Sequence, residues 1–375
     1  MKHTFRIVAG MLLLAIPLCA NAQVKLKKPE NQTTEKTETT VKPEVKEPKG
    51  GFEMPKISGF VQGMYEANLN EEGELLNNTL KMRRVRMSID GKLAPSLSYK
   101  IQGDFTRKPM LVDAFLKYKV SPAFAIQLGQ FKTPFTIESP INPVNLEIFD
   151  YGEVIQALGG YNDVCGVGSL GRDLGLMATG SLFPVETRNG DKFGLVDYSI
   201  GVFNGNGANE KDNNNRKDIV GRLDIHPWVK ALTLSGSYYY GKYYKDELEN
   251  GPRNRWAAGM QYNDGKVLLR GEYVSGETGL KTVIPEEEWS LYNSNGYYAV
   301  AGYNFQAGEQ KIMPVLRYEH LTKDASVENG GTNWYTAGIN YWPLKSVNCK
   351  LDYSLIQKEA GGNSHRVVAM VSYKF

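Results

Sequence analysis

The chain ends with His365–Phe375, HRVVAMVSYKF, in which every second position is apolar. This apolar row consists of Val367, Ala369, Val371, Tyr373 and Phe375. Because the side chains of a β-strand point alternately to its two faces, the pattern predicts a strand with one apolar face. Its length, about ten residues, is what a tilted strand needs to cross a bilayer. A half-buried strand of a soluble β-sandwich would show the same pattern, so other parts of the chain must decide.

Residues 1–22 have the three parts of a secretory signal peptide. Lys2 and Arg6 precede the apolar run Ile7–Leu18, and Ala20-Asn21-Ala22 forms a small-x-small cleavage site. The run is too short to span a membrane, because a helix needs about 20 apolar residues for that. We therefore expect cleavage after Ala22 and secretion through the inner membrane.

The exported chain divides once. Residues 23–56 are rich in Lys, Glu, Thr and Pro with almost no large apolar side chains, which predicts a flexible periplasmic tail, either a tether to the cell wall or a plain spacer. Gly and Tyr are prominent in residues 57–375, and the whole sequence holds 39 Gly and 22 Tyr. Aromatic girdles are typical of outer-membrane barrels, and glycine relieves crowding in strands. Residues 57–375 are therefore predicted to form one β-barrel domain.

Sixteen segments of this domain alternate like strands, and bacterial barrels have an even number. They are residues 57–68, 80–93, 97–106, 112–120, 124–131, 173–183, 195–204, 218–225, 232–244, 255–263, 267–277, 295–305, 311–321, 332–342, 347–357 and 365–375. Short turns such as Ala94-Pro95-Ser96 alternate with longer loops such as Gly205–Lys217, as in a barrel with both ends in the periplasm. One predicted inner turn, Pro184–Gly194, is longer than this scheme prefers. The predicted fold is an all-β, transmembrane antiparallel β-barrel of about 16 strands.

Three short stretches resemble one family. Gly129–Glu138, GQFKTPFTIE, and Gly171–Gly175, GRDLG, flank the longest connection of the chain, and Arg83–Arg86, RRVR, lies on the second predicted strand. These stretches are similar to the phosphate-selective porin O and P family. The resemblance implies a homotrimer in the outer membrane of a Gram-negative bacterium, placed in the lipid by the barrel assembly machinery, with a lumen that draws in small anions. In outer-membrane barrels as a class a C-terminal Phe is commonly an assembly signal, which assigns that role to Tyr373 and Phe375.

The longest connection, Lys132–Gly171, joins the fifth and sixth predicted strands on the outer side. A connection of this length without regular structure is usually functional. In general porins the corresponding loop folds into the lumen, so the resemblance implies a constriction loop here. Its single Lys faces five acids, and such a loop would oppose anions unless arginines of the wall outweigh them. The acids are Glu138, Glu147, Asp150, Glu153 and Asp163.

Strand alternation assigns charges to the lumen. With Val85 and Met87 toward lipid, Arg84 and Arg86 point inward with no acid nearby on their strand until Asp90, which predicts a cationic patch of the kind that makes an anion pore. Arg222, Arg270, Arg317, Lys350 and Arg366 also fall on the polar face, together with Asp224, Glu272, Glu319 and Asp352. The alternative is that these charges neutralise one another as ladders across the wall.

Two positions at the ends of the long loop are further candidates. Lys132 stands where the fifth strand ends, just before Pro134. It either reaches into the constriction as a point charge for an oxyanion or binds a loop carboxylate such as Glu138. Arg172 and Asp173 are predicted to form a structural pair at the loop's return.

Other chemistry is disfavoured. The net charge of +3 comes without a dominant basic cluster, so no nucleic-acid partner is expected. The cysteines lack metal-ligand spacing, and no metal or cofactor is predicted. Residues 166–171, GVGSLG, match GxGxxG but lead into a strand instead of a helix, so no catalytic residue is assigned and no enzyme is expected.

The predicted function is passive diffusion of small hydrophilic solutes, with an anion or phosphate preference as the refinement that the family implies. The alternative is a plugged outer-membrane barrel with a structural or surface-binding role. A secreted soluble all-β enzyme is disfavoured by the order of the loops and by Phe375.

Overall fold

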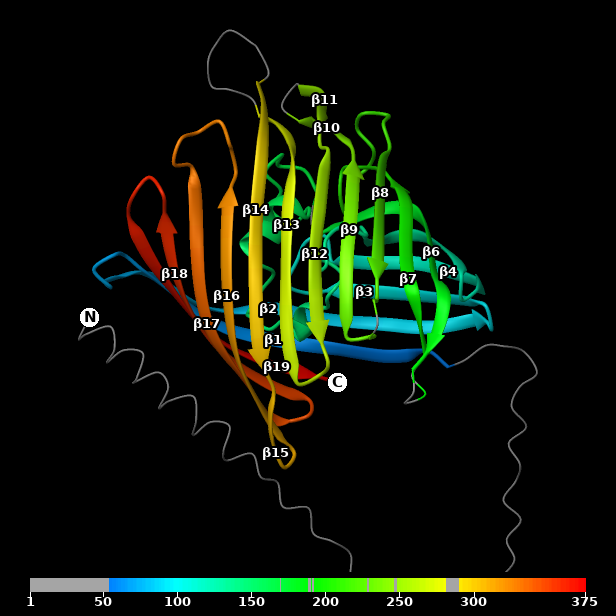
Figure 1. Ribbon diagram of the computed structural model, residues 1–375, viewed down its shortest axis with the longest axis horizontal. Coiled ribbons are helices and arrows are strands. Elements are labelled where there is room, and N and C mark those ends of the chain that lie inside the picture. The colour runs from blue at the N-terminus through cyan, green and yellow to red at the C-terminus, as the bar shows by residue number, and fades with distance from the viewer. Residues whose placement is uncertain are drawn as a thin grey trace, which may run out of the picture.

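The computed structural model describes residues 54–168, 170–187, 190, 192–227, 229–245, 248–280 and 290–375. The predicted signal peptide and nearly all of the predicted tail lie outside the described residues. Sixteen antiparallel wall strands close into a barrel, in which each pairs with the next along the chain (Figure 1). They are β1 (Lys56–Leu69), β2 (Leu75–Ala94), β3 (Leu97–Asp104), β4 (Leu111–Ser121), β5 (Phe124–Lys132), β6 (Arg172–Glu186), β7 (Lys192–Phe203), β8 (Asp218–Ile225), β9 (Leu232–Tyr240), β12 (Arg255–Asn263), β13 (Val267–Leu280), β14 (Ser290–Tyr303) with its continuation β15 (Phe305–Ala307), β16 (Gln310–Thr322), β17 (Gly331–Leu344), β18 (Val347–Lys358) and β19 (Asn363–Lys374).

The barrel closes between its first and last strands. β1 pairs with β2 on one side and with β19 on the other, with Phe60 opposite Lys374. Gly59 N donates to Phe375 O at 2.9 Å and Phe375 N donates to Gly59 O at 3.0 Å. A Cβ atom on Gly59 would lie 2.6 Å from the Phe375 ring, so glycine is what lets the terminal ring pack against β1. Closure pairs both edges of the sheet and so removes a template for aggregation.

Alternation along the strands separates a charged lumen from an apolar exterior, as the sequence predicts. On β16, Arg317 and Glu319 are buried inside the barrel, whereas Leu316 is 64% exposed on the outer surface. On β2, Arg84 and Arg86 are buried and Met87 is exposed. An exposed apolar band on the outside of a closed barrel is the surface that a lipid bilayer covers.

Most strand boundaries lie within three residues of the predicted ones, but β2 and β14 each begin five residues earlier, at Leu75 and Ser290. Two further differences concern the connections. The predicted strand 232–244 ends at Tyr240, and after Gly241 the chain forms a separate hairpin of β10 (Lys242–Lys245) and β11 (Leu248–Pro252). The long inner turn predicted at 184–194 is shorter, because β6 and β7 pair as far as Glu186 and Lys192. The hairpin stands above the ends of the wall strands in Figure 1.

Residues 133–171, here called the inner loop, connect β5 to β6 and contain two short helices. These are η1 (Pro143–Asn145) and α2 (Glu153–Leu158), and α2 contacts β13, β14 and β16. Val154 and Ile155 are fully buried, and burial of such a side chain is worth about 1.5–3 kcal/mol. A Cβ on Gly296 of β14 would lie 2.8 Å from Val154. The helix therefore packs against the wall at a glycine, where the wall has no side chain. Among the described residues, no helix is long and apolar enough to cross a membrane.

Candidate functional site

The inner loop is held to the barrel wall through its acids. Each of its five carboxylates forms an ion pair with at least one arginine of the wall or its loops. The pairs are Glu138 with Arg270 and Arg317, Glu147 with Arg270, Asp150 with Arg83 and Arg84, Glu153 with Arg366, and Asp163 with Arg253 and Arg255. The sequence predicts that this loop opposes anions unless arginines of the wall outweigh its acids, and every one of the five acids is paired with arginine.

Glu138 is the most heavily bonded of these acids. Arg317 Nη1 donates to Glu138 Oε2 at 2.5 Å, Arg270 Nη1 donates to the same oxygen at 3.2 Å, and Gly152 N donates to Oε1 at 2.8 Å. Burial raises the pKa of Glu138, but the nearby Arg317 and Arg270 outweigh it and hold the pKa below its ordinary value. The carboxylate is thus ionised and joins two wall strands to the inner loop.

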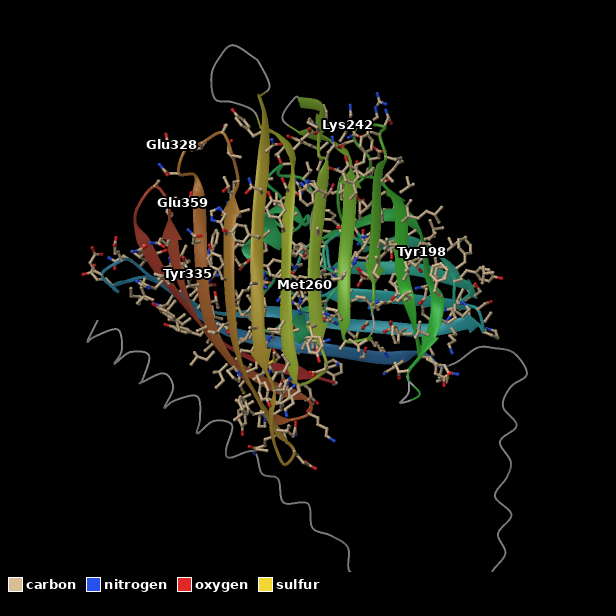
Figure 2. The ribbon with its side chains drawn as sticks, viewed as in Figure 1. Tyr198, Lys242, Met260, Glu328, Tyr335 and Glu359 are labelled. Carbon is tan, nitrogen blue, oxygen red and sulfur yellow. The ribbon has the colours of Figure 1, made fainter. Side chains whose placement is uncertain are left out.

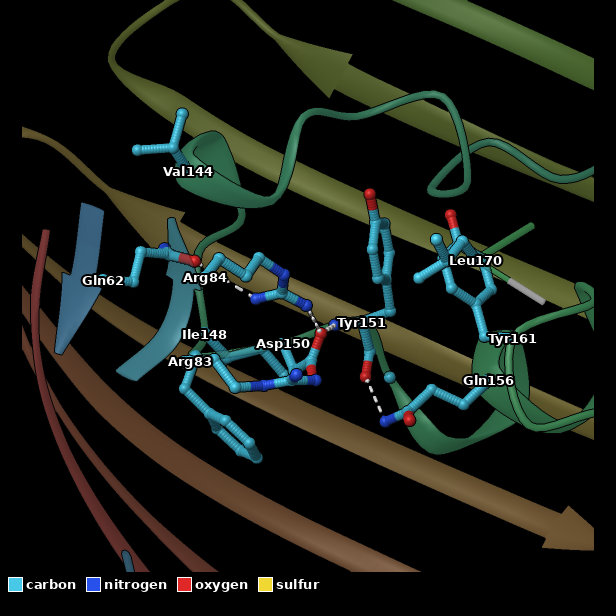
Figure 3. Close-up of polar contacts among 12 residues, drawn as sticks. Gln62, Arg83, Arg84, Val144, Ile148, Asp150, Tyr151, Gln156, Tyr161 and Leu170 are labelled. Carbon is cyan, nitrogen blue, oxygen red and sulfur yellow. Dashed lines mark hydrogen bonds and ion pairs between the residues drawn. The ribbon is translucent and has the colours of Figure 1, made fainter. Parts of the chain in front are cut away.

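Asp150 lies between Arg83 and Arg84 of β2 (Figure 3). Arg84 Nη2 donates to Asp150 Oδ1 at 2.5 Å, and Arg84 Nη1 donates to Gln62 Oε1 at 3.2 Å. Burial opposes ionisation of Asp150, yet the charges of Arg84 and Arg83 lower its pKa to about 2. The strand itself supplies no acid before Asp90, as the sequence indicates, but Arg84 finds a carboxylate partner in a distant part of the chain.

Arg86 also has a partner that its own strand does not supply. Its Nε donates to Asp104 Oδ2, on the neighbouring strand β3, at 2.9 Å. The predicted cationic patch is therefore partly compensated at both Arg84 and Arg86.

Lys132 is half-buried at the neck of the inner loop. Its Nζ donates to Ser139 O and Ile141 O, each at 2.6 Å, and to the Tyr151 hydroxyl at 2.7 Å. Glu138 is bound by arginines instead, so the predicted alternative of a Lys132–Glu138 pair is wrong. Strand periodicity cannot reveal this arrangement, because the acceptors are backbone carbonyls of a segment that turns back on itself.

Arg172 and Asp173 lie at the loop's return but do not pair with each other. Arg172 donates from Nε and Nη2 to the two carboxylate oxygens of Asp113 on β4, at 2.6 and 3.1 Å. Asp173 accepts from the backbone N–H groups of Gly205 and Leu174, each at 2.7 Å. Both side chains are buried, and each is bonded to a different neighbouring segment.

Some of the remaining wall cations pair with acids on their own strands, and others bind the inner loop. Arg222 with Asp224 and Arg317 with Glu319 are ladder pairs on their own strands, at 2.8 and 3.0 Å. Arg270 turns instead to Glu147 and Glu138, and Lys350 donates to Leu146 O and Ile148 O of the inner loop.

Two cavities remain between the inner loop and the β2–β5 side of the wall. The outer cavity, toward the outer loops, has about 200 Å³ and is lined by Arg83, Arg84, Arg86, Arg107, Asp150, Tyr151, Gln156, Tyr161, Asn162, Leu170 and Arg172. The inner cavity, toward the β2–β3 turn, has about 240 Å³ and is lined by Arg86, Lys100, Gln102, Asp113, Phe115, Gln127, Phe131, Lys132, Pro140, Asn142, Pro143 and Arg172. Arg86 and Arg172 line both cavities and therefore lie between them.

Positive charge exceeds negative charge around the outer cavity. Its five guanidinium groups are paired with only three carboxylates, those of Asp104, Asp113 and Asp150. In the described part of the chain, the Nε atoms of Arg84 and Arg107 are buried and have no hydrogen-bond partner. The cavity is suited to an anion because the guanidinium groups around it outnumber their carboxylate partners.

Sequence reasoning missed Arg107 as a lumen residue. It lies three positions after the inward-facing Asp104, with its Nε 3.8 Å from the Asp104 carboxylate. It also missed that Tyr151 and Tyr161, whose ring centroids are 4.4 Å apart, form the loop side of the outer cavity (Figure 3). The signal that was available is the surplus of acids in the inner loop, which matches the surplus of arginines on the wall.

A closed barrel of sixteen antiparallel strands, apolar outside and charged within, defines an outer-membrane porin. The chain belongs to the family described as "Phosphate-selective porin O and P", whose model matches residues 56–375. The family resemblance seen in the sequence is thereby confirmed. The protein is accordingly an outer-membrane porin of a Gram-negative bacterium.

Solved structures share the fold at low sequence identity. The anion-selective porin from Comamonas acidovorans is 14% identical with a TM-score of 0.62, over 86% of this chain and 99% of that chain. Salmonella typhi OmpF, in complex with daunomycin, is 13% identical with a TM-score of 0.59, over 86% and 97%. OmpT of Vibrio cholerae, in a trimer form, is 12% identical with a TM-score of 0.53, over 86% and 100%. No curated protein sequence matches this chain significantly.

Proposed function

We propose that this porin conducts small hydrophilic solutes with a preference for anions, phosphate among them, along the outer and inner cavities. The observation that carries the proposal is the set of five guanidinium groups around the outer cavity, two of them with an unpartnered buried Nε. Fixed cations along a narrow passage favour anions, since the local potential raises their concentration. The anion-selective porin of similar fold supports the same preference.

The residues act at two levels in this proposal. Four arginines present positive charge to the solute: Arg84, Arg86, Arg107 and Arg172. Lys132 holds the inner loop in position opposite these arginines through its bonds to the loop backbone. Arg222, Arg270 and Arg317 lie behind the inner loop and hold it in place, so their contribution to solute attraction is indirect.

The proposal includes the assembly and the export route, which rest on the sequence of residues 1–56 and on the family resemblance. The chain is secreted by a signal peptide at 1–22, carries a periplasmic tail to about residue 56, and is inserted as a homotrimer with Tyr373 and Phe375 in the assembly signal. The trimer form among the similar structures supports this state. Solutes move down their gradients, and the protein catalyses no reaction.

The test is the reversal potential of purified protein in a planar bilayer under a potassium chloride gradient. Wild-type protein should favour chloride, and added phosphate should reduce the chloride current. Arg107→Gln should lower the chloride preference about twofold to fivefold, as loss of up to about 1 kcal/mol of attraction implies. Arg216→Gln, in an exposed outer loop, is the matched control and should leave the preference unchanged. A preference for potassium in the wild type would overturn the proposal.

A second function is supported by how tightly the inner loop is held. It bonds to β2, β8, β9, β13 and β16–β19, and the two cavities found beside it near β2–β5 are small. A barrel closed in this way would be a structural or surface-binding protein. Folded protein that gives no single-channel conductance would favour this function over the porin proposal.

A further inference from the structure

The outer face of the barrel carries an apolar groove of about 830 Å³ over β12–β18. Small residues form its floor, because Gly271 pairs with Ala299 and Ala301 lies two positions further along β14. Larger side chains, Met260 and Leu316 among them, form its sides. Met260 and Tyr335 mark this face of the molecule in Figure 2. The groove lies in the middle of the strands, where a bilayer presents only hydrocarbon.

A second, polar pocket of about 600 Å³ lies on the same strands, toward the outer loops. It is lined by Tyr238, Asn254, Trp256, Ser275, Gly276, Glu277, Asn293, Asn295 and Ala325. Alternate residues of a strand point to the same face of the sheet. Gly271 in the groove and Ser275 in the pocket therefore share the outer face of β13, and Ala299 and Asn295 share the outer face of β14. The polar pocket therefore continues the apolar groove toward the membrane surface.

The lining of the polar pocket indicates which headgroup it suits. Trp256 is 46% exposed and packs against Tyr273 at a tilt, with ring centroids 5.2 Å apart. Asn254 Nδ2 donates to Glu277 Oε2 at 2.8 Å, whereas Asn254 Oδ1 is buried and has no partner among the described residues. None of the described residues that line the pocket is Lys or Arg. The uncharged polar side chains of Ser275, Asn293 and Asn295 line the pocket beside this aromatic platform, which suits a sugar, and Glu277 repels a phosphate.

The groove and the pocket together suit one amphipathic molecule. Between lipid chains and an apolar protein surface there is no hydrophobic driving force, so a retained lipid needs close packing and a polar anchor. If mobile lipids fill the groove only loosely, the side chains that line it lose dispersion contacts. An acyl chain held in one conformation in the groove restores them. Aromatic side chains at the level of the headgroups, here Trp256 and Tyr238, are typical of this interface. We propose that the outer face of β12–β18 binds a glycolipid with an uncharged sugar headgroup, with an acyl chain in the groove and the sugar in the polar pocket.

The proposal is tested by native mass spectrometry of the porin purified from mixed vesicles. The vesicles contain equal amounts of monoglucosyl diacylglycerol and phosphatidylglycerol with the same acyl chains. Wild-type protein should retain the glucolipid in preference to phosphatidylglycerol. Ala301→Phe, which fills the groove, should reduce retention about fivefold, the factor that about 1 kcal/mol represents. Asn254→Leu should remove the preference between the two headgroups.

Ala178→Phe is the matched control, because Ala178 also faces outward but lies on β6, across from Ile126 and Ile200. It should leave lipid retention unchanged, and heat-modifiable migration on a gel should show that all variants are folded. Equal retention of both lipids by the wild type would overturn the proposal. Loss of the trimer in Ala301→Phe without any lipid bound to the wild type would assign this face to a contact between copies instead.

Discussion

Glu138 and Arg317 are 179 residues apart in the sequence and form a fully buried ion pair, with 2.5 Å between Glu138 Oε2 and Arg317 Nη1. Arg270 completes the cluster from a third segment of the chain. Removing one partner of a buried ion pair typically costs about 3–5 kcal/mol, because it leaves the other charge uncompensated. The cluster is therefore expected to control whether the inner loop stays against the wall.

Glu138→Gln should loosen the inner loop and leave the barrel folded, since the strand pairing does not involve this residue. We expect higher single-channel conductance with more open-channel noise. Glu186→Gln, at the exposed end of β6 where Glu186 pairs with Lys192, is the control and should behave as the wild type. Unchanged conductance and noise in Glu138→Gln would show that other contacts suffice to hold the loop.

Acid should release the inner loop near β2. The pKa of Asp150 falls from 3.8 to about 2 in the folded protein, so its contribution to loop docking is complete above pH 4 and is lost as the pH falls toward 2. A shift of this size corresponds to about 2 kcal/mol. The pKa values of Glu138 and Asp163 are also lowered, because arginines outweigh their burial, and both act in the same direction.

Open-channel noise recorded between pH 7 and pH 2 checks this expectation. It should stay constant down to about pH 4 and then increase. Asp150→Asn should be noisy at neutral pH and respond less to acid. Glu153 acts in the opposite sense. Burial raises its pKa despite the nearby Arg366, so its contribution to loop docking is lost as the pH rises. Noise that increases above pH 5 would implicate Glu153 and contradict the role given to Asp150.

Most of the barrel follows from local sequence, whereas the charged site does not. β8 and β12 have the predicted bounds, because strict alternation and turn residues mark both of their ends. The break at Gly241 is hidden within a run of tyrosines that continues the strand pattern on both sides. The two-residue alternation of each strand thus determines which side chains face the lumen, as Arg84 and Arg86 illustrate.

The partners of the lumen charges could not be predicted, because they depend on how the inner loop folds back. Arg84 meets Asp150 across 66 positions, and Arg255 meets Asp163 across 92. Alternation places each arginine inside the barrel but carries no information about which distant carboxylate reaches it. Lys132 was harder still, since two of its acceptors are backbone carbonyls, which every residue possesses.

Lys132→Met should disturb the neck of the inner loop, because it removes one of the two donors from each of the carbonyls of Ser139 and Ile141. The hydroxyl groups of Tyr161 and Tyr151 remain bonded to these carbonyls, so the loss is that of hydrogen bonds from a charged donor, each worth about 1.5–3 kcal/mol. Lys132→Arg keeps the charge but cannot place a compact ammonium among the same acceptors. If Lys132 positions the loop, both variants should alter single-channel conductance. If it acts only as a charge for anions, Lys132→Arg should retain the wild-type conductance and reversal potential.

Gly59→Ala should impair closure of the barrel. The added Cβ would lie 2.5 Å from Arg86 O and 2.6 Å from the Phe375 ring, so either the backbone or the terminal ring must move. Inserting a methyl group into a packed contact of this kind costs about 1–3 kcal/mol. We expect a lower yield of heat-modifiable, folded protein and a lower melting temperature for the fraction that folds.

Gly221→Ala on β8 is the control, because no atom lies within 4 Å of the position that its Cβ would take. It should fold as well as the wild type, which would show that loss of a strand glycine is not harmful in itself. Gly59→Ala combined with Phe375→Leu separates the two contacts of Gly59. Recovery of folding in the double variant would assign the damage to the terminal ring, whereas no recovery would assign it to the Arg86 carbonyl. Normal folding of Gly59→Ala alone would mean that β1 and β19 tolerate a wider seam than their hydrogen bonds indicate.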